Sequence, residues 1–170
     1  MTDFQSADVM TIKYAGFTLI ELVVVIIILG ILAAMVLPRY AALETKARIA
    51  KLSGARGAVK SAAALTHFAC LATQAPTPCT SAAYTLTMEG VGITLINQYP
   101  TANAAGIVAA AGLTRTAAEG FDSQGGGGAA GDSITIRMLG NDPANCSFTY
   151  TAPAGINLAP VHGAPVTTGC

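Results

Sequence analysis

The stretch GFTLIELVVVIIILGILAAMVLP, residues 16–38, decides the fold of this chain. From Phe17 to Leu37 it carries a single charge, that of Glu21. A helix of this length rises about 30 Å, which matches the hydrocarbon thickness of a bilayer. In lipid, a helix satisfies every backbone N–H and C=O within one segment, so the modest helix propensity of Val and Ile is no obstacle. The stretch therefore predicts a membrane-spanning helix.

Three interpretations of this segment compete. A cleaved secretory signal would end its apolar core at a small-residue site, but Met35 to Leu37 continue the apolar run past Ala33 and Ala34. A plain anchor tolerates Glu21, because a carboxylate near the interface costs less than the roughly 2.5–3.5 kcal/mol of a central one. The third interpretation gives Glu21 a partner of opposite charge.

The sequence GFTLIE, residues 16–21, resembles the processing site of type IV pilins and their relatives. The resemblance implies that a membrane peptidase cuts after Gly16 and that the new N-terminal residue, Phe17, is N-methylated. It also implies that Glu21 serves assembly. A glycine and a proline of the family pattern fall on Gly30 and Pro38, so the match covers the whole membrane segment without a gap.

Pairing explains the glutamate in physical terms. In a filament of packed apolar helices, the amine of one subunit's Phe17 can meet the carboxylate of a neighbour's Glu21. Each charge is costly alone in an apolar setting, and pairing offsets much of that cost. Because one axial stagger brings the two together, the pair would also set the register of the filament.

Gly30 and Pro38 predict a weak part of the helix. Proline removes one backbone hydrogen bond and clashes with the carbonyl of Ala34, and glycine costs about 1 kcal/mol in a helix interior. We expect a kink here, or unwinding in the assembled fibre, and the resemblance implies the same. The alternative is a mild kink without consequence.

Residues 1–16, MTDFQSADVMTIKYAG, are interpreted as a leader that is removed on maturation. The full leader holds Asp3, Asp8 and Lys13, whereas a start at Met10 leaves Lys13 as its only charged side chain. Positive charge marks the cytoplasmic side of a membrane segment. The shorter form also resembles the basic leaders of the type IVa subclass, which favours Met10 as the start.

The rest of the chain predicts an α+β fold. After the membrane and filament-core helix of residues 17–37, we expect an exported helical half over 38–72 and a globular head over 73–170. Leu52 and Val59 share one face of that second half. This face should pack on a small antiparallel sheet.

Alternating residues predict the strands of the head. Residues 83–100, AYTLTMEGVGITLINQYP, predict a hairpin that turns near Glu89-Gly90, and SITIRML and CSFTYT predict further strands. Between them, residues 101–113 predict a short helix with Thr101 or Asn103 as its cap. The glycine-rich residues 120–132 are interpreted as a flexible surface loop.

Four cysteines allow three disulfide pairings. Spacing favours Cys70–Cys79 and Cys146–Cys170, because each pair closes a short loop rich in turn residues. Disulfides indicate an oxidising compartment beyond the membrane segment. A zinc site would call for clustered pairs such as Cys-x-x-Cys, and the sequence holds none.

Six basic residues lie between Arg39 and Lys60, against one acid, Glu44. One interpretation is a stripe that contacts nucleic acid. The other is a solvated helix face that meets acidic patches on neighbouring subunits. No aromatic residues interleave with these charges in the way that nucleic-acid binding favours, so the second interpretation is preferred.

The sequence shows no catalytic constellation, so an enzyme is not expected. His67 falls in the helix and His162 in the C-terminal tail, and neither is grouped with a nucleophile. The glycine-rich stretch lacks the Gly-Lys-Ser/Thr of a phosphate-binding loop. Asp122 and Asp132 lack the spacing of an EF-hand, so neither a metal nor another cofactor is predicted.

Residues 87–113, with VLPRY at 36–40, resemble the mannose-sensitive haemagglutinin group of type IVa pilins. This finer resemblance implies a structural subunit of a surface filament for attachment, biofilm formation or motility. Its partners would be copies of itself in a helical filament, the prepilin peptidase and methylase, and the assembly machinery of the inner membrane. The chain would cross that membrane once with its head in the periplasm, and would later stand in an extracellular pilus.

Two alternatives stay open. One is a minor pilin or a type II secretion pseudopilin. The other, of a different class, is an adhesin pilin whose head binds a ligand or DNA directly.

Overall fold

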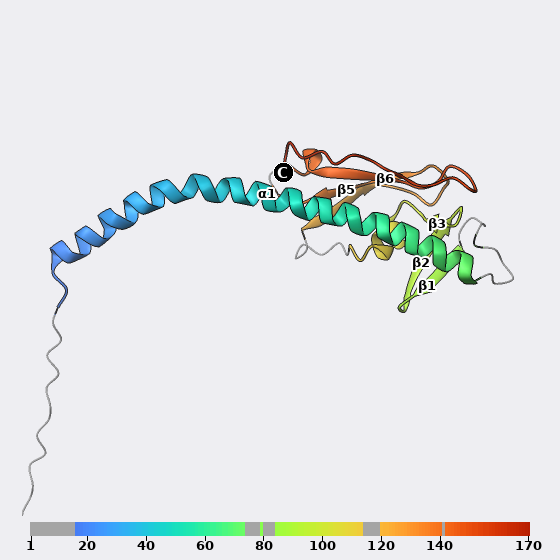
Figure 1. Ribbon diagram of the computed structural model, residues 1–170, viewed down its shortest axis with the longest axis horizontal. Coiled ribbons are helices and arrows are strands. Elements are labelled where there is room, and N and C mark those ends of the chain that lie inside the picture. The colour runs from blue at the N-terminus through green and yellow to red at the C-terminus, as the bar shows by residue number, and fades with distance from the viewer. Residues whose placement is uncertain (1–15, 74–78, 80–83, 114–119, 141) are drawn as a thin grey trace, which may run out of the picture. The chain divides into compact units, whose positions relative to one another are not determined.

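The computed structural model describes residues 16–73, 79, 84–113, 120–140 and 142–170, with the backbone alone at 37, 38, 41 and 42. The chain divides into two compact units, Met1–Ala41 and Ala42–Cys170. One helix, α1 (Leu19–Thr73), contributes residues to both units (Figure 1). The predicted leader lies outside the described residues, apart from Gly16.

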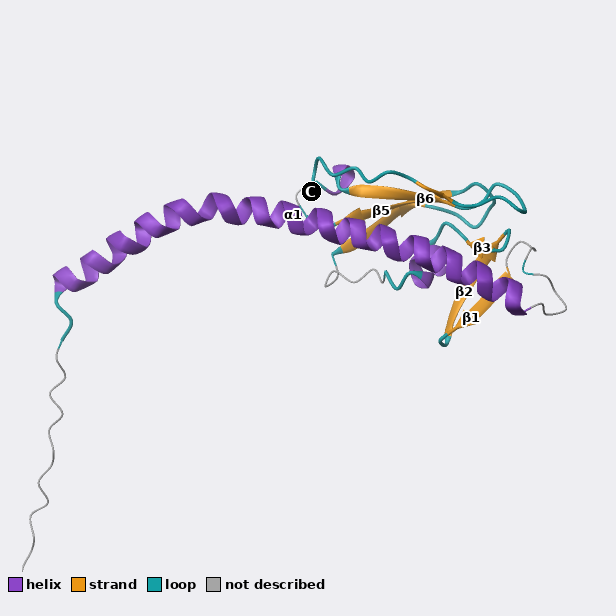
Figure 2. Cartoon of the chain, viewed as in Figure 1, coloured by secondary structure: helices purple, strands orange, loops and turns teal. Residues whose placement is uncertain are grey.

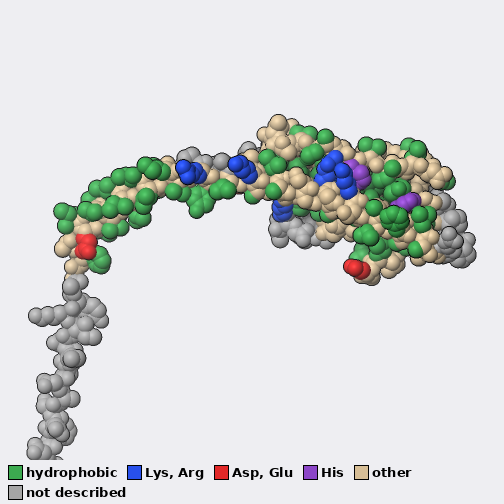
Figure 3. Space-filling model, viewed as in Figure 1, with side chains coloured by type: hydrophobic (Ala, Val, Ile, Leu, Met, Phe, Trp, Pro, Cys, Tyr) green, Lys and Arg blue, Asp and Glu red, His purple; other side chains and the backbone are tan. Residues whose placement is uncertain are grey.

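The described part of the first unit is an apolar helical segment whose described side chains are all exposed. Residues Leu19–Val36 are long and apolar enough to cross a membrane, and none of them is buried within the protein. Hydrophobic side chains cover this part of α1 in Figure 3. Phe17, just before the helix, is 82% exposed.

The second unit begins with an antiparallel sheet of β1 (Tyr84–Met88), β2 (Val91–Ile96) and β3 (Tyr99–Pro100), in that order. Met88 pairs with Val91, so the turn between β1 and β2 is Glu89-Gly90, where the sequence predicts it. Both turn residues have positive φ, +51° and +81°. That combination is typical of two-residue hairpin turns, whose twist matches that of the strands.

A short π-helical turn, η1 (Ala104–Val108), follows β3. Asn103 is its cap, one of the two predicted: its side-chain oxygen accepts from the backbone N–H of Gly106 at 2.8 Å. The turn is shorter than the helix predicted over residues 101–113, and its backbone is interrupted at Gly106, whose φ of −98° and ψ of −106° are not helical. A Cβ on Gly106 would lie 2.2 Å from the carbonyl oxygen of Thr101, so the close approach requires glycine.

The second sheet is antiparallel and has the order β4 (Phe121–Gly125), β5 (Ser133–Met138), β6 (Ser147–Thr151) and β7 (Val161–His162). A single 3₁₀ turn, η2 (Pro143–Asn145), lies between β5 and β6. The interpretation of residues 120–132 as one flexible loop is wrong for β4. Phe121 is buried, and Asp122 forms an ion pair with Arg137 on the adjacent strand.

The core lies between α1 and these two sheets (Figure 2). The predicted helix face is buried: Leu52 and Val59 are fully buried, in one cluster with side chains of β5 and β6. Tyr150 of β6 donates its hydroxyl to the carbonyl of Pro100 in β3 at 2.8 Å, which links the two sheets. In the second unit, α1 therefore packs on two small antiparallel sheets, whereas the sequence predicts one.

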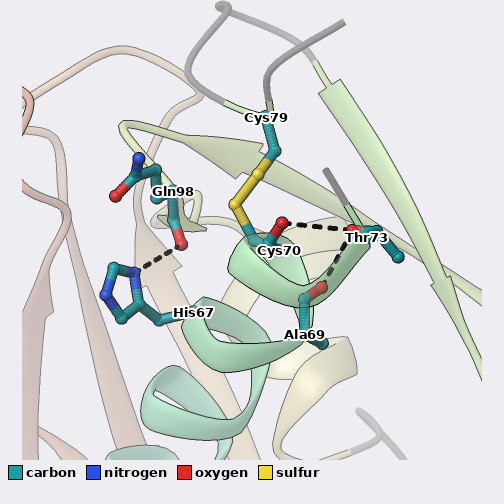
Figure 4. Close-up of a disulfide and its surroundings, with 6 residues drawn as sticks. All are labelled: His67, Ala69, Cys70, Thr73, Cys79 and Gln98. Atoms are coloured by element: carbon teal, nitrogen blue, oxygen red, sulfur yellow. Dashed lines mark hydrogen bonds between the residues drawn. A yellow bond between two sulfur atoms is a disulfide. The ribbon is translucent and has the colours of Figure 1, made fainter. Parts of the chain in front are cut away.

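Two disulfides cross-link the second unit, and their pairing is the one that the spacing favours. Cys70, near the end of α1, is bonded to Cys79, with 6.0 Å between their Cα atoms (Figure 4). Cys146 is bonded to Cys170, at a Cα distance of 4.8 Å. Cys146 and Cys170 belong to the core cluster of α1 and the second sheet, whereas Cys70 and Cys79 belong to a separate cluster with the first.

Candidate processing and assembly site

The N-terminus of α1 is built around a capping threonine. Thr18 precedes the first helical residue, Leu19, and its hydroxyl oxygen accepts from the backbone N–H of Glu21 at 3.3 Å. The carbonyl of Thr18 accepts from the same N–H at 3.1 Å and from Leu22 at 3.3 Å. Thr18 thereby satisfies a donor that the first turn of a helix leaves without a partner.

Thr18 is the residue of this site that sequence reasoning missed, although a signal for it exists. Thr18 and Glu21 stand three residues apart, the spacing of a capping box, just before an apolar run. The helix start therefore follows from the sequence. Glu21 lies in the first turn, where the positive end of the helix macrodipole favours a carboxylate.

The carboxylate of Glu21 is exposed, and within the described part of the chain no hydrogen bond or ion pair is recorded for it. Its surroundings on α1 are apolar: Ile20 is 72% exposed and Leu22 is 60% exposed. Burial of this apolar surface against another molecule would also bury the carboxylate of Glu21, which is costly unless that molecule brings an opposite charge.

Gly30 and Pro38 both lie within α1. A Cβ on Gly30 would meet nothing within 4 Å, so packing inside this chain does not require glycine there. The kink, and the unwinding on assembly, stay predictions.

The basic stripe of α1 is partly engaged within the chain. Arg48 forms an ion pair with Glu44 at 2.6 Å, one helical turn away. Arg56 donates from Nε to the carbonyl of Gly163 at 2.8 Å and from Nη2 to that of His162 at 3.3 Å. Arg48 and Arg56 therefore have partners within the chain, and Glu44 compensates the charge of Arg48.

The aspartates considered for a metal have structural contacts. Asp132 accepts from the backbone N–H of Ala129 at 2.8 Å, and Asp122 pairs with Arg137. Across the described residues, no group of three or more His, Cys, Asp and Glu side chains is placed to hold a metal ion.

Comparison with known proteins bears on the N-terminal site. The family description "Prokaryotic N-terminal methylation motif" matches residues 12–37, a range that includes Gly16, Phe17, Glu21 and Gly30 and ends one residue before Pro38. No solved structure matches the chain.

Two curated proteins are similar to part of it. The type IV major alpha-pilin of Moraxella bovis is 39% identical over 79 residues, which are 46% of this chain and 46% of that protein. The type IV narrow pilus major component PilA5 of Thermus thermophilus is 48% identical over 50 residues, 29% of this chain and 43% of that protein. The matched regions thus span less than half the length of either relative. The chain carries the prokaryotic N-terminal methylation motif, and over as much as 46% of its length it is similar to type IV major pilins.

Proposed function

We propose that this protein is a structural subunit of a type IV pilus, which polymerises through the apolar part of α1. One observation carries the proposal: Leu19–Val36 form a helix of which nothing is buried, and a carboxylate without a described partner stands in its first turn. The methylation motif and the similarity to major pilus components support it. Its role is assembly rather than catalysis.

Maturation prepares this helix for assembly. A prepilin peptidase cuts between Gly16 and Phe17 and removes the leader, and Phe17 is then N-methylated. Until assembly the helix spans the inner membrane, with the head in the periplasm, and assembly carries the subunit into an extracellular fibre. The two disulfides are consistent with an oxidising compartment of this kind. A leader that starts at Met10 would resemble the short basic leaders of the type IVa subclass, so this subclass and this start are proposed together.

At the N-terminus of α1, the amine of Phe17 in one subunit and the carboxylate of Glu21 in another are complementary charges. After cleavage, the amine of Phe17 lies two residues before the first helical residue, where the positive end of the helix dipole disfavours a cation. The same dipole end favours Glu21. A second subunit, staggered so that its amine meets Glu21, relieves both the unfavourable position of the amine and the isolation of the carboxylate. This stagger sets the register of neighbouring helices.

Substitution of Glu21 tests the assembly mechanism. We expect Glu21→Val to be inserted and cut normally but to yield few filaments, because the apolar helix is intact while the register contact is gone. Glu44→Gln is the matched control: it removes an exposed carboxylate from the same helix, one that is paired within its own chain. The readout is the amount of subunit in the sheared surface fraction. A wild-type filament yield from Glu21→Val would contradict the mechanism.

Intact mass and N-terminal sequencing of sheared material test the function itself. A chain that begins with methylated Phe17, holds two disulfides and dominates the sheared fraction supports a major pilus subunit. The same chain in trace amounts would indicate a minor pilin or a pseudopilin. A chain that keeps its leader, or that begins after Ala34 and is free in the medium, would overturn the proposal.

A further inference from the structure

Two adjoining hollows open on the head, beside the C-terminal part of α1. Their volumes are about 400 and 260 Å³, and they share His67, Tyr99 and Ala159 as lining residues. We call the joined space the α1–tail groove. Its remaining lining residues are Lys60, Ala63, Ala64, Phe68, Leu71, Gln98, Asn157, Leu158, Pro160 and His162. All of them lie within the unit Ala42–Cys170, so the groove belongs to the head alone.

One wall of the groove is a flat aromatic surface. The rings of His67 and Tyr99 are stacked, with 4.3 Å between centroids and an interplanar angle of 2°. The imidazole Nδ1 of His67 lies 3.4 Å from the carbonyl oxygen of Gln98, toward which the ring points (Figure 4). Phe68, the next residue on α1, is 66% exposed at the edge of this wall. The stacking on Tyr99 and the contact with Gln98 orient the ring of His67, so the wall presents a preformed surface to a ligand.

The groove carries positive charge without a compensating acid. Lys60 lines it, and neither hollow has an Asp or a Glu among its lining residues. In the described part of the chain, Lys60 has neither an ion pair nor a hydrogen bond. Histidine and basic side chains share one face of the head in Figure 3.

Polar groups complete the lining. Gln98 and Asn157 bring side-chain amides to the larger hollow. His162 lines the smaller one, and its Nδ1 atom is buried without a hydrogen-bond partner in the described structure. Burial, followed by the charges of Lys60 and Arg56, lowers the pKa of His162, which favours its neutral form. A neutral imidazole donates from one ring nitrogen and accepts at the other.

We propose that the α1–tail groove binds an acidic sugar residue of a polysaccharide. The apolar C–H face of a pyranose ring packs on the stacked aromatic wall, its hydroxyls bond to the amides, and its carboxylate meets Lys60 through a charge-assisted contact. The size fits, since sites for small ligands span roughly 300–1,000 Å³. A neutral sugar would leave Lys60 unpaired, whereas nucleic acid would require a longer track of cations.

The test uses the full-length mature chain in detergent micelles, so it does not depend on filament assembly. Trigalacturonate and sialyllactose are the acidic probes, and the trimethyl ester of trigalacturonate is the neutral control. Isothermal calorimetry should detect at least one acidic probe. The ester should bind about tenfold more weakly than the acid, because a lost charge-assisted contact is worth at least that factor.

Two substitutions assign the binding to the groove. Lys60→Gln should weaken it about tenfold, and Lys46→Gln, an exposed lysine on the same helix outside the groove, should leave it unchanged. Phe68→Ala should weaken it, while Leu65→Ala, at 60% exposure and also outside the groove, should not.

The proposal is overturned if neither acid binds, if the ester binds as well as the acid, or if Lys60→Gln binds like the wild type. Self-association or oligonucleotide binding that is lost in Lys60→Gln, with no saccharide bound, would assign the groove to another copy of the chain or to nucleic acid instead. Because all readouts concern the isolated chain, failure here leaves the proposed function untouched.

Discussion

The two disulfides differ in the length of chain that they close, which allows a quantitative prediction. Cys146 and Cys170 are 24 residues apart, and Cys70 and Cys79 are 9 apart. On the chain-entropy account, the longer loop contributes about 3.5 kcal/mol to stability and the shorter one about 2.6 kcal/mol. Removal of the Cys146–Cys170 bridge should therefore lower the free energy of unfolding by about 0.9 kcal/mol more than removal of the Cys70–Cys79 bridge.

Burial does not confound this comparison. Cys146 and Cys170 are 2% and 7% exposed, and Cys70 and Cys79 are 2% and 8% exposed. Replacing either pair by alanine thus loses a similar amount of packing, and that loss largely cancels in the difference. Alanine also avoids the buried hydroxyls that serine would introduce, which carry a desolvation cost.

The assay is urea unfolding of the full-length chain in a mild detergent. Tyrosine fluorescence reports mainly on the head, since three of the five tyrosines, Tyr84, Tyr99 and Tyr150, lie there and the chain has no tryptophan. The two double-alanine variants are compared with the wild type under identical conditions, and the m-values must agree for the comparison to hold. Equal losses, or a larger loss for the shorter loop, would refute the loop-entropy reasoning.

Three further predictions concern single residues. Arg56→Met removes the N–H groups that bond to the backbone carbonyls of β7 and of the residue after it; unfolding should cost about 1.5–3 kcal/mol less, as measured with urea. Gly106→Ala places a Cβ against the carbonyl of Thr101 and should destabilise by about 1–3 kcal/mol, whereas Gly54→Ala, with open space around it, should stabilise α1 by up to about 1 kcal/mol in the same assay. Burial and then the nearby cations lower the pKa of His162, so the folded state binds fewer protons than the unfolded state. Stability is therefore complete above the unfolded pKa of about 6.5 and falls as the pH drops through it. Urea midpoints between pH 7.5 and 5.5 should show this fall in the wild type and a smaller one in His162→Gln.

Sequence reasoning worked best where the signal is local. The apolar run after Phe17 predicts the exposed helical segment, and the alternating residues on either side of Glu89-Gly90 predict the first hairpin. The periodic positions of Leu52 and Val59 predict the face of α1 that the core covers. In each case the physical cause acts over a few residues, so a short window of sequence contains it.

The features that escaped prediction depend on distant partners. Strand β4 is rich in polar residues and glycine, and its stability comes from pairing with β5 and from the burial of Phe121. Arg56 bonds to a carbonyl 107 residues away, which no local pattern indicates. The α1–tail groove likewise joins helix residues to the C-terminal tail. Thr18 differs from these features, because the Thr-x-x-Glu spacing of a capping box is a local signal in the sequence.

The exposed apolar segment of α1 has an energetic consequence for the proposed filament. Lipid tails and the interior of a helical bundle are equally apolar, so moving Leu19–Val36 from one to the other gains no hydrophobic free energy. In water the same side chains would be costly, each by about 1.5–3 kcal/mol. Under the proposed function, the subunit therefore passes directly from the bilayer to the fibre without a dissolved stage. Since the two end states differ little in hydrophobic free energy, polar contacts such as the one proposed for Glu21 then decide how stable the fibre is.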